Sequence, residues 1–268
     1  MCLILFALEA HPEYPLIVAA NRDEAYSRPT ARAAFWEEHP RVYGGRDLEQ
    51  GGTWLSVTRD GRFSAVTNYR QGVRSTGAER SRGGLPREFL IGSEAPAAYL
   101  RGVETHAADY NGFSLIVGES SDMWFYSNRG AAAQKIAPGV HGLSNHLLDE
   151  PWPKVRRGVA ELSSLLEADE NELITRLFAL LADRAPAPDE FLPATGVTRE
   201  RERALSASFI EGEAYGTRAS TVVLVGSDGQ ALVRERSFGP GGATHGEAEQ
   251  RFALDRGVSC APPARARA

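Results

Sequence analysis

Residues 1–29 read MCLILFALEAHPEYPLIVAANRDEAYSRP, and this stretch decides the fold class. Residues 2–8 and 15–20 are short runs rich in Ile, Leu and Val, and a polar segment with turn-forming residues separates them. Two such runs predict a β-hairpin, and their lack of polar alternation indicates that both faces of the hairpin are buried. Strands buried on both faces need cover on both sides, so the hairpin belongs inside a layered fold.

The same pattern returns three times along the chain. Apolar runs pair across short turns at residues 52–58 and 62–69, 113–119 and 122–128, and 220–226 and 230–237. Two of these turns contain Asp-Gly, which is a strong hairpin signal. Helical spacing of apolar residues appears at 85–110, with a break near Gly92, and at 151–167 and 169–184, whereas the Pro-rich and charged residues 185–203 predict an exposed loop.

Hairpins buried on both faces, with helices grouped between them, predict an α+β fold with four αββα layers. In it, two stacked, mainly antiparallel sheets carry helices on their outer faces. No linker divides the chain, so we expect one domain over residues 1–256 and a disordered Pro/Ala/Arg tail over 257–268.

Composition excludes several classes of function. The 268 residues carry a net charge of −5, which offers no basic surface to nucleic acid or to an anionic membrane. No apolar run approaches the ~20 residues of a membrane span. The two cysteines, Cys2 and Cys260, form no CxxC motif, and the histidines have no metal-binding spacing. We expect a cytoplasmic protein with a small-molecule ligand and no metal site.

Polar residues stand where buried strands end. Asn21, Arg22, Asp23 and Glu24 follow directly after an apolar run. Strand alternation sends Asn21 and Asp23 to one face and Arg22 and Glu24 to the other. Further strand ends carry Asn68, Asn145 and Arg218. A strand-end Asn is often only a turn former, but together these residues indicate a site at the mouths of the strands.

Cys2 has two interpretations. It is a small apolar residue in a buried strand, or it is a nucleophile that becomes the first residue once Met1 is removed. In the second case one residue carries both a thiol and a free α-amine, and the amine can act as the base for the thiol.

Seven motifs, taken in order, resemble the NRDE family, the family of the Transport and Golgi Organisation 2 proteins. They are MC, AANRDEAYSRP, GGTWL, AVTNYR, YNGF, GLSN and YGTRASTV, and they span about residues 1–255. NRDE proteins are similar to N-terminal-nucleophile (Ntn) hydrolases, so the resemblance also implies the αββα sandwich. Among more distant relatives, the cholylglycine hydrolase group of amidases has an ordered set of site residues that matches Cys2, Asp23, Asn68, Asn145 and Arg218.

The resemblance implies hydrolysis of a linear amide through a thioester. Cys2 is then nucleophile and base, and Asp23 orients its ammonium group. Asn68 holds the oxyanion, Asn145 positions the substrate or the amine, and Arg22 or Arg218 favours the thiolate. One departure stands out: those hydrolases have an Arg three residues before the Asp, where this chain has Ala20 and instead places Arg22 beside Asp23.

The candidate substrate-binding residues are Asn21, Trp54, Tyr69 and His146. The alternative function is a non-enzymatic carrier, because NRDE proteins are associated with haem mobilisation and lipid homeostasis. A pocket lined by Trp54, Tyr69 and Phe113 could hold a flat or apolar ligand, with haem as the possible one. No other cofactor is expected.

Overall fold

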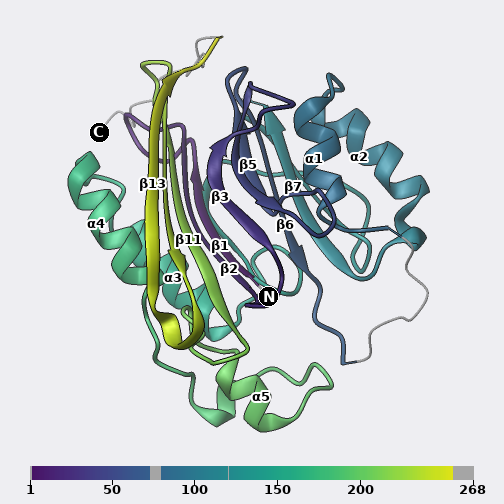
Figure 1. Cartoon of the computed structure of the whole chain (residues 1–268), viewed down its shortest axis with the longest axis vertical. Helices are drawn as coiled ribbons and strands as arrows, with labels where there is room; N and C mark the ends of the chain where they lie inside the picture. Colours follow the sequence, from purple (N-terminus) through teal and green to yellow (C-terminus); the bar gives the residue numbers. More distant parts are fainter. Residues whose placement is uncertain (1, 73–79, 120, 256–268) are drawn as a thin grey trace, which may run out of the picture.

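The computed structural model describes residues 2–72, 80–119 and 121–255. Two β-sheets lie face to face in this part of the chain, and helices cover the outer face of each sheet (Figure 1). This order of layers confirms the predicted α+β sandwich. The predicted end of the domain at residue 256, the tail 257–268 and Cys260 lie outside the described residues.

The two strands of the opening hairpin are interior strands of the first sheet. Its strands are β1 (Cys2–Leu8), β2 (Leu16–Ala25), β10 (Gly139–Leu143), β11 (Tyr215–Val225), β12 (Gln230–Phe238) and β13 (Thr244–Ala253). They run antiparallel to their neighbours in the order β10–β1–β2–β11–β12–β13. The hairpin is therefore completed by strands from the middle and the end of the chain.

The second sheet follows the chain more simply. Its strands are β3 (Thr30–Phe35), β4 (Val42–Asp47), β5 (Leu55–Thr58), β6 (Arg62–Asn68), β7 (Phe113–Glu119), β8 (Asp122–Ser127) and β9 (Gln134–Lys135). They pair antiparallel in sequence order. All four predicted hairpins are thus present, two in each sheet.

Alternate residues of β1 and β2 supply two separate cores. Ile4, Phe6 and Val18 pack between the sheets, whereas Leu5 and Ile17 pack against the helices outside the first sheet. This double burial explains why the opening residues show no polar alternation.

Helices cover the sheets in two groups. Helices α1 (Gly84–Ile91) and α2 (Pro96–Thr105) pack on the second sheet, and α3 (Pro153–Ser163) and α4 (Glu170–Leu181) pack on the first. Short 3₁₀ helices lie at Ala107–Asp109, Asp189–Phe191 and Pro240–Gly242. Among the described residues, none of the helices combines the length and the apolar character of a transmembrane segment.

The predicted exposed loop at 185–203 is partly wrong. It runs into a further helix, α5 (Arg199–Ala204), and Glu202 of this helix is buried. Its sequence, RERERA, has no apolar stripe, so helical periodicity could not reveal it. A buried ion pair described below fixes it instead.

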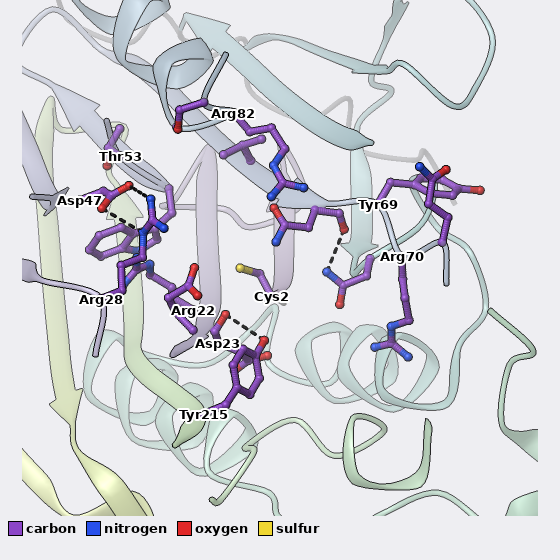
Figure 2. A pocket seen from close by; sticks show the side chains of 18 of the residues that line it. Cys2, Arg22, Asp23, Arg28, Asp47, Thr53, Tyr69, Arg70, Arg82 and Tyr215 are labelled. Carbon is purple, nitrogen blue, oxygen red and sulfur yellow. Dashed lines mark hydrogen bonds and ion pairs between the residues drawn. The ribbon is translucent and has the colours of Figure 1, made fainter. Parts of the chain in front are cut away.

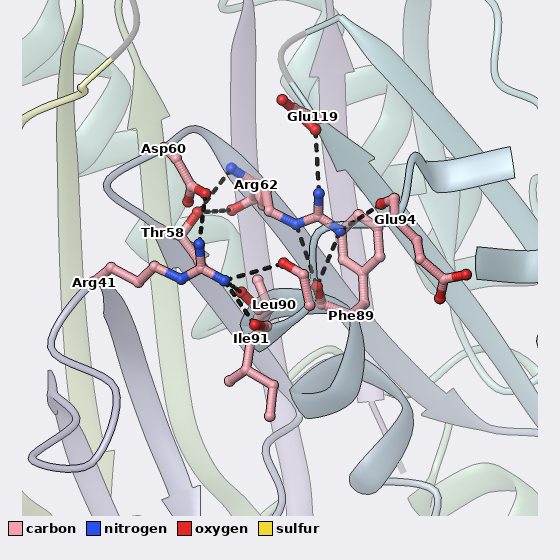
Figure 3. A network of polar contacts seen from close by, with 10 residues as sticks. Arg41, Thr58, Asp60, Arg62, Phe89, Leu90, Ile91, Glu94 and Glu119 are labelled. Atoms are coloured by element: carbon pink, nitrogen blue, oxygen red, sulfur yellow. Dashed lines mark hydrogen bonds and ion pairs between the residues drawn. The ribbon is translucent and has the colours of Figure 1, made fainter. Parts of the chain in front are cut away.

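Two arginines hold the end of α1 against the second sheet (Figure 3). Arg62 on β6 is 3% exposed, donates to the carbonyls of Phe89 and Glu94, and forms an ion pair with Glu119. Arg41 donates to the carbonyls of residues 90–92. The last carbonyls of a helix have no partner inside the helix, so these guanidinium groups supply the missing donors.

Replacing Arg62 with Met should lower the free energy of unfolding by about 2–4 kcal/mol, because it leaves buried carbonyls without donors. Arg41→Met is the matched control: its side chain is 39% exposed, so water can replace it, and we expect a loss of about 1 kcal/mol. Urea denaturation of both variants measures the difference. Equal losses would contradict the structural role given to Arg62.

Candidate functional site

A cavity of about 450 Å³ lies where β1 begins and β2 runs past it (Figure 2). A volume of this size is typical of small-molecule sites. The cavity contains seven of the ten residues predicted for the site: Cys2, Arg22, Asp23, Trp54, Asn68, Tyr69 and Asn145.

Cys2 is the first residue of β1 and pairs with Arg22 across the hairpin. Its thiol points into the cavity (Figure 2). Burial raises the pKa of the Cys2 thiol, while the positive charge of Arg22 acts in the opposite direction. The sulfur atom is therefore reachable from the cavity, and its ionisation depends on the charges around it.

Asp23 is 1% exposed and lines the same cavity. Its Oδ1 accepts a hydrogen bond from the Thr217 hydroxyl at 2.7 Å, across the β2–β11 pair. Burial raises the pKa of the Asp23 carboxyl, and the charges of Lys154 and Arg70 oppose this shift. Because β1 begins opposite Arg22, Asp23 stands at the open end of the hairpin, where side chains from both faces of β2 reach the cavity.

Arg22 points to the opposite face of β2 from Asp23. Its guanidinium carbon lies 4.2 Å from the centre of the Trp54 ring, and the group donates to the Thr30 hydroxyl at 3.0 Å. Trp54 also lines a second cavity of about 370 Å³. Gly45 makes room for this ring, since a Cβ there would lie 2.2 Å from it.

Asn68 and Asn145 line the same cavity as Asp23 and contact each other. The Asn145 amide donates to the backbone carbonyl of Asn68 at 2.9 Å. Asn145 is fully buried, and its Oδ1 has no hydrogen-bond partner among the described residues. A buried acceptor beside the Cys2 cavity is suited to receive an N–H group.

The structure places three of the predicted residues outside this cavity. Asn21 faces α4 and donates to the carbonyls of Leu181 and Ser208, so the prediction that it lines a substrate pocket finds no support in its position. The alternation of β2 is the reason, because Asn21 lies within the paired region, one residue before Arg22. It is a buried link between layers.

Arg218 lines the second cavity together with Trp54. A β-bulge between Thr217 and Ala219 makes Arg218 an extra residue in β11. Its guanidinium donates to the carbonyls of residues 25, 26 and 28, and so it fixes the turn after β2. Arg22, and not Arg218, is the arginine beside Cys2.

His146 reaches the cavity only through Tyr69, whose hydroxyl lies 2.6 Å from Nε2 of His146. Phe113, expected beside Trp54 and Tyr69, instead packs in the core between the second sheet and its helices. An apolar pocket made by these three aromatic residues is therefore absent from this part of the structure.

Several charged residues of the cavity were not predicted. Arg70 forms a buried ion pair with Glu202 of α5 at 2.5 Å, and this pair holds α5 beside the cavity. Arg28 pairs with Asp47 at 2.7 Å. Arg70 belongs to the motif AVTNYR, but its sequence position gives no sign of a partner 132 residues away.

The loop that carries Arg82 reaches the cavity because its backbone at Gly83 packs directly against the backbone at Gly52. The Thr53 amide donates to the Gly83 carbonyl at 3.0 Å, and a Cβ on Gly52 would lie 2.4 Å from Gly83. The GGTW motif therefore allows two backbone segments to touch, and this contact brings Arg82 to the cavity wall (Figure 2).

Lys154, on the first turn of α3, is the second unpredicted charge near Asp23. It is 1% exposed, and burial lowers its pKa to about 8 against the opposing charge of Asp23. The chain has only one other lysine, Lys135. The rarity of lysine in this Arg-rich sequence was the signal that could have identified Lys154 as a candidate site residue.

The groups of this arrangement are suited to acyl transfer. The described residues contain no group of three or more His, Cys, Asp or Glu side chains that could hold a metal ion. The cavity instead combines a thiol, a buried carboxylate and two amides. These are the group types that a nucleophilic mechanism with an oxyanion intermediate requires.

Comparison of sequences gives consistent relatives. A family model described as Transport and Golgi organisation 2 matches residues 1–240. The chain is 38% identical over 260 residues to a Transport and Golgi organization protein 2 homolog of Bos taurus, covering 89% of this chain and 93% of that protein. The Homo sapiens homolog is 36% identical over the same shares. The Drosophila melanogaster protein is 29% identical, covering 92% and 95%.

Comparison of structures gives more distant likenesses. A mutant of the conjugated bile acid hydrolase from Clostridium perfringens is 9% identical, with a TM-score of 0.49 over 95% of this chain and 93% of that one. A Caenorhabditis elegans ortholog of N-acylethanolamine-hydrolyzing acid amidase is 13% identical, with a TM-score of 0.38 over 66% and 85%.

Asn21→Ala should lower the free energy of unfolding by about 2–4 kcal/mol, because it removes three buried hydrogen bonds that join β2 to α4, β11 and Ser208. The alkylation rate of Cys2 in the folded variant should match that of the parent protein. Urea denaturation and iodoacetamide labelling test the two statements. Loss of Cys2 reactivity with unchanged stability would instead mean that Asn21 acts in the Cys2 site.

The pKa of Lys154 predicts a pH dependence of stability. The folded pKa of about 8 lies below the ordinary value of 10.5, so between these values the unfolded chain binds more protons and stability rises with pH. Relative to Lys154→Met, the parent protein should gain roughly 2 kcal/mol between pH 8.5 and pH 10. Denaturation at both pH values measures this. A constant difference between the two proteins would mean that Lys154 titrates normally.

Proposed function

The chain belongs to the Transport and Golgi organisation 2 family, and from the cavity around Cys2 we propose that it is an N-terminal cysteine amidohydrolase. It acts on a linear C–N amide bond after removal of Met1. The observation that carries the proposal is that Cys2, Asp23, Asn68 and Asn145 line a single cavity although they lie far apart in sequence.

In the first step the α-amine of Cys2 takes the thiol proton, and the sulfur attacks the amide carbon. Reference pKa values of about 8.5 for a thiol and 7.7–8.0 for an α-amine make this transfer accessible near neutral pH. Asp23 orients the resulting ammonium group, in the way that the third member of a catalytic triad orients its base. Arg22 stabilises the thiolate by its positive charge.

The oxyanion of the tetrahedral intermediate is held by the Asn68 amide. Loss of one such donor in other enzymes costs roughly 10²–10³ in rate. The buried Oδ1 of Asn145 accepts from the α-amine and fixes its lone pair toward the thiol. Two residues thereby divide two tasks, since one binds the substrate oxygen and the other the base.

Collapse of the intermediate breaks the C–N bond, and the ammonium of Cys2 gives its proton to the leaving amine. A thioester on Cys2 remains. A water molecule, deprotonated by the same α-amine, then attacks the thioester carbon. The carboxylic acid leaves and the thiol takes back the proton. Apart from the substrate and one water molecule, each step uses groups of this chain.

The alternative is a carrier of haem or of a lipid-like acyl ligand. Two observations favour the amidase. Among the residues that the structure describes, no histidine lines the Cys2 cavity as a possible haem ligand, and charged residues from Arg22 to Arg201 surround the cavity with few apolar side chains between them. Saturable binding of haem or a fatty acyl compound without turnover would instead support the carrier.

Cys2→Ala should abolish turnover of N-acyl amides that release a fluorescent amine, whereas Cys260→Ser should retain it. Intact mass of the parent protein should show loss of Met1, and a quenched reaction should show an acyl group on Cys2. Full turnover in Cys2→Ala, or retention of Met1 in the active protein, would contradict the proposal.

A further inference from the structure

Lys154 is a buried charge for which the amidase mechanism above has no use. Its side chain is 1% exposed, and its Nζ donates to the backbone carbonyl of Leu205 at 3.2 Å. Within residues 2–72, 80–119 and 121–255, no carboxylate lies within ion-pair distance of Nζ. The ammonium is therefore held in place by one neutral acceptor and by longer-range charge.

This position is costly for a cation in two respects. Burial penalises the charged ammonium form. In addition, Lys154 follows Pro153 at the start of α3, and a helix N-terminus carries partial positive charge that disfavours a cation. An apolar side chain such as Met would fill the same space without either penalty. A charged side chain kept in a position that disfavours its charge usually has a role in a functional site nearby.

Hydrogen bonds join Lys154 to the Cys2 site through residues 205–210. The Leu205 carbonyl accepts from Nζ of Lys154, and the Ile210 amide donates to the Thr217 hydroxyl, which in turn donates to Oδ1 of Asp23.

The charges of the Cys2 site act on Lys154. Asp23 and Cys2 favour its ammonium form, and Arg70 opposes it. In return, Lys154 acts on the Asp23 carboxyl more strongly than Arg70 does, and Arg70 is itself engaged by Glu202. The charged and titratable groups around this cluster are Cys2 on β1, Arg22 and Asp23 on β2, Arg70 after β6, Glu202 on α5 and Tyr215 on β11.

We propose that Lys154 is a positioning residue of the amidase site: its ammonium keeps Asp23 ionised and favours the thiolate of Cys2. The inference rests on the proposed function, because it gives the lysine a task in preparing the nucleophile. Lys154 supplies the positive charge on the helix side of the first sheet. Arg22 supplies it on the opposite face, between the sheets.

The charge balance supports this task. Arg70 is paired with Glu202, and Arg22 lies on the opposite face of β2 from Asp23, against the Trp54 ring, so Lys154 supplies positive charge on the Asp23 side. The thiolate–ammonium pair that Cys2 forms before attack adds no net charge. Without Lys154 the Asp23 carboxylate would lose this compensation, which would raise the pKa of the thiol and of the α-amine alike.

The test uses the full chain with Cys260→Ser, so that Cys2 is the only thiol, and with loss of Met1 verified by intact mass. The rate of iodoacetamide alkylation is measured from pH 5.5 to pH 9.5. Lys154→Met should move the midpoint to higher pH and slow alkylation at pH 7 by roughly 3–10-fold. The alkylation profile of Lys154→Arg should stay close to that of the parent protein. Lys135→Met changes the exposed lysine of β9 and is the control, so its profile should coincide with that of the parent protein.

Two results would overturn the proposal. One is a Lys154→Met profile that coincides with the parent profile. The other is equal shifts in Lys154→Met and Lys154→Arg, since these would assign the effect to packing and not to charge.

If Lys154→Met does not fold, NMR on protein labelled in its two lysines replaces it. The Lys154 signal, assigned by elimination in Lys135→Met, should titrate at lower pH in Asp23→Asn, because the carboxylate that favours the ammonium is gone. An unchanged midpoint would refute the coupling. Neither measurement involves amide turnover, so an inactive but coupled protein would contradict the amidase function and leave the Lys154 assignment standing.

Discussion

The antiparallel pairing of β1 with β2 is the interaction on which the rest of the structure depends. It places Cys2 opposite Arg22 and ends β1 beside Asp23. Because both strands are buried on both faces, a shift by one residue would exchange the inter-sheet core for the helix-side core. The register is therefore fixed by packing over the length of the hairpin. The cavity lies where that packing ends. The packing of the seven residues of β1 therefore determines where the Cys2 thiol lies.

Much of the fold could be predicted because its signals are local. Apolar runs around Asp-Gly turns predicted hairpins that the structure contains, and the Gly92 break predicted where α1 ends. Strand ends also predicted part of the cavity lining, since Arg22, Asp23, Asn68 and Asn145 converge there. Alternation was correct for the split between Asn21 and Arg22, but it could not tell that Asp23 would reach the same cavity as Arg22. That outcome depends on where β1 begins. Its first residue, Cys2, pairs with Arg22, so Asp23 lies one residue beyond this pairing.

The rest of the site depends on contacts over long separations in sequence. The Arg70–Glu202 pair joins a strand end to a short helix without an apolar stripe, and a pattern within either segment cannot report the other. Lys154 was hidden for a different reason: an amphipathic pattern assigns a helix face, and a lysine in such a pattern is normally assigned to solvent. Arg218 lies outside the Cys2 cavity because of a β-bulge, an extra residue in the strand pairing. The sequence of β11 does not predict this bulge.

The order of strands in the first sheet also sets the timing of assembly. The hairpin of β1 and β2 emerges first during synthesis, but its neighbours β10 and β11 begin at Gly139 and Tyr215, and α5 begins at Arg199. At ~5–20 residues per second, a ribosome needs about 10–45 s to reach β11. The walls of the cavity close around Cys2 only after this delay. During that interval the N-terminal strand is not yet enclosed by the rest of the fold, and this is the interval in which the proposed removal of Met1 would take place.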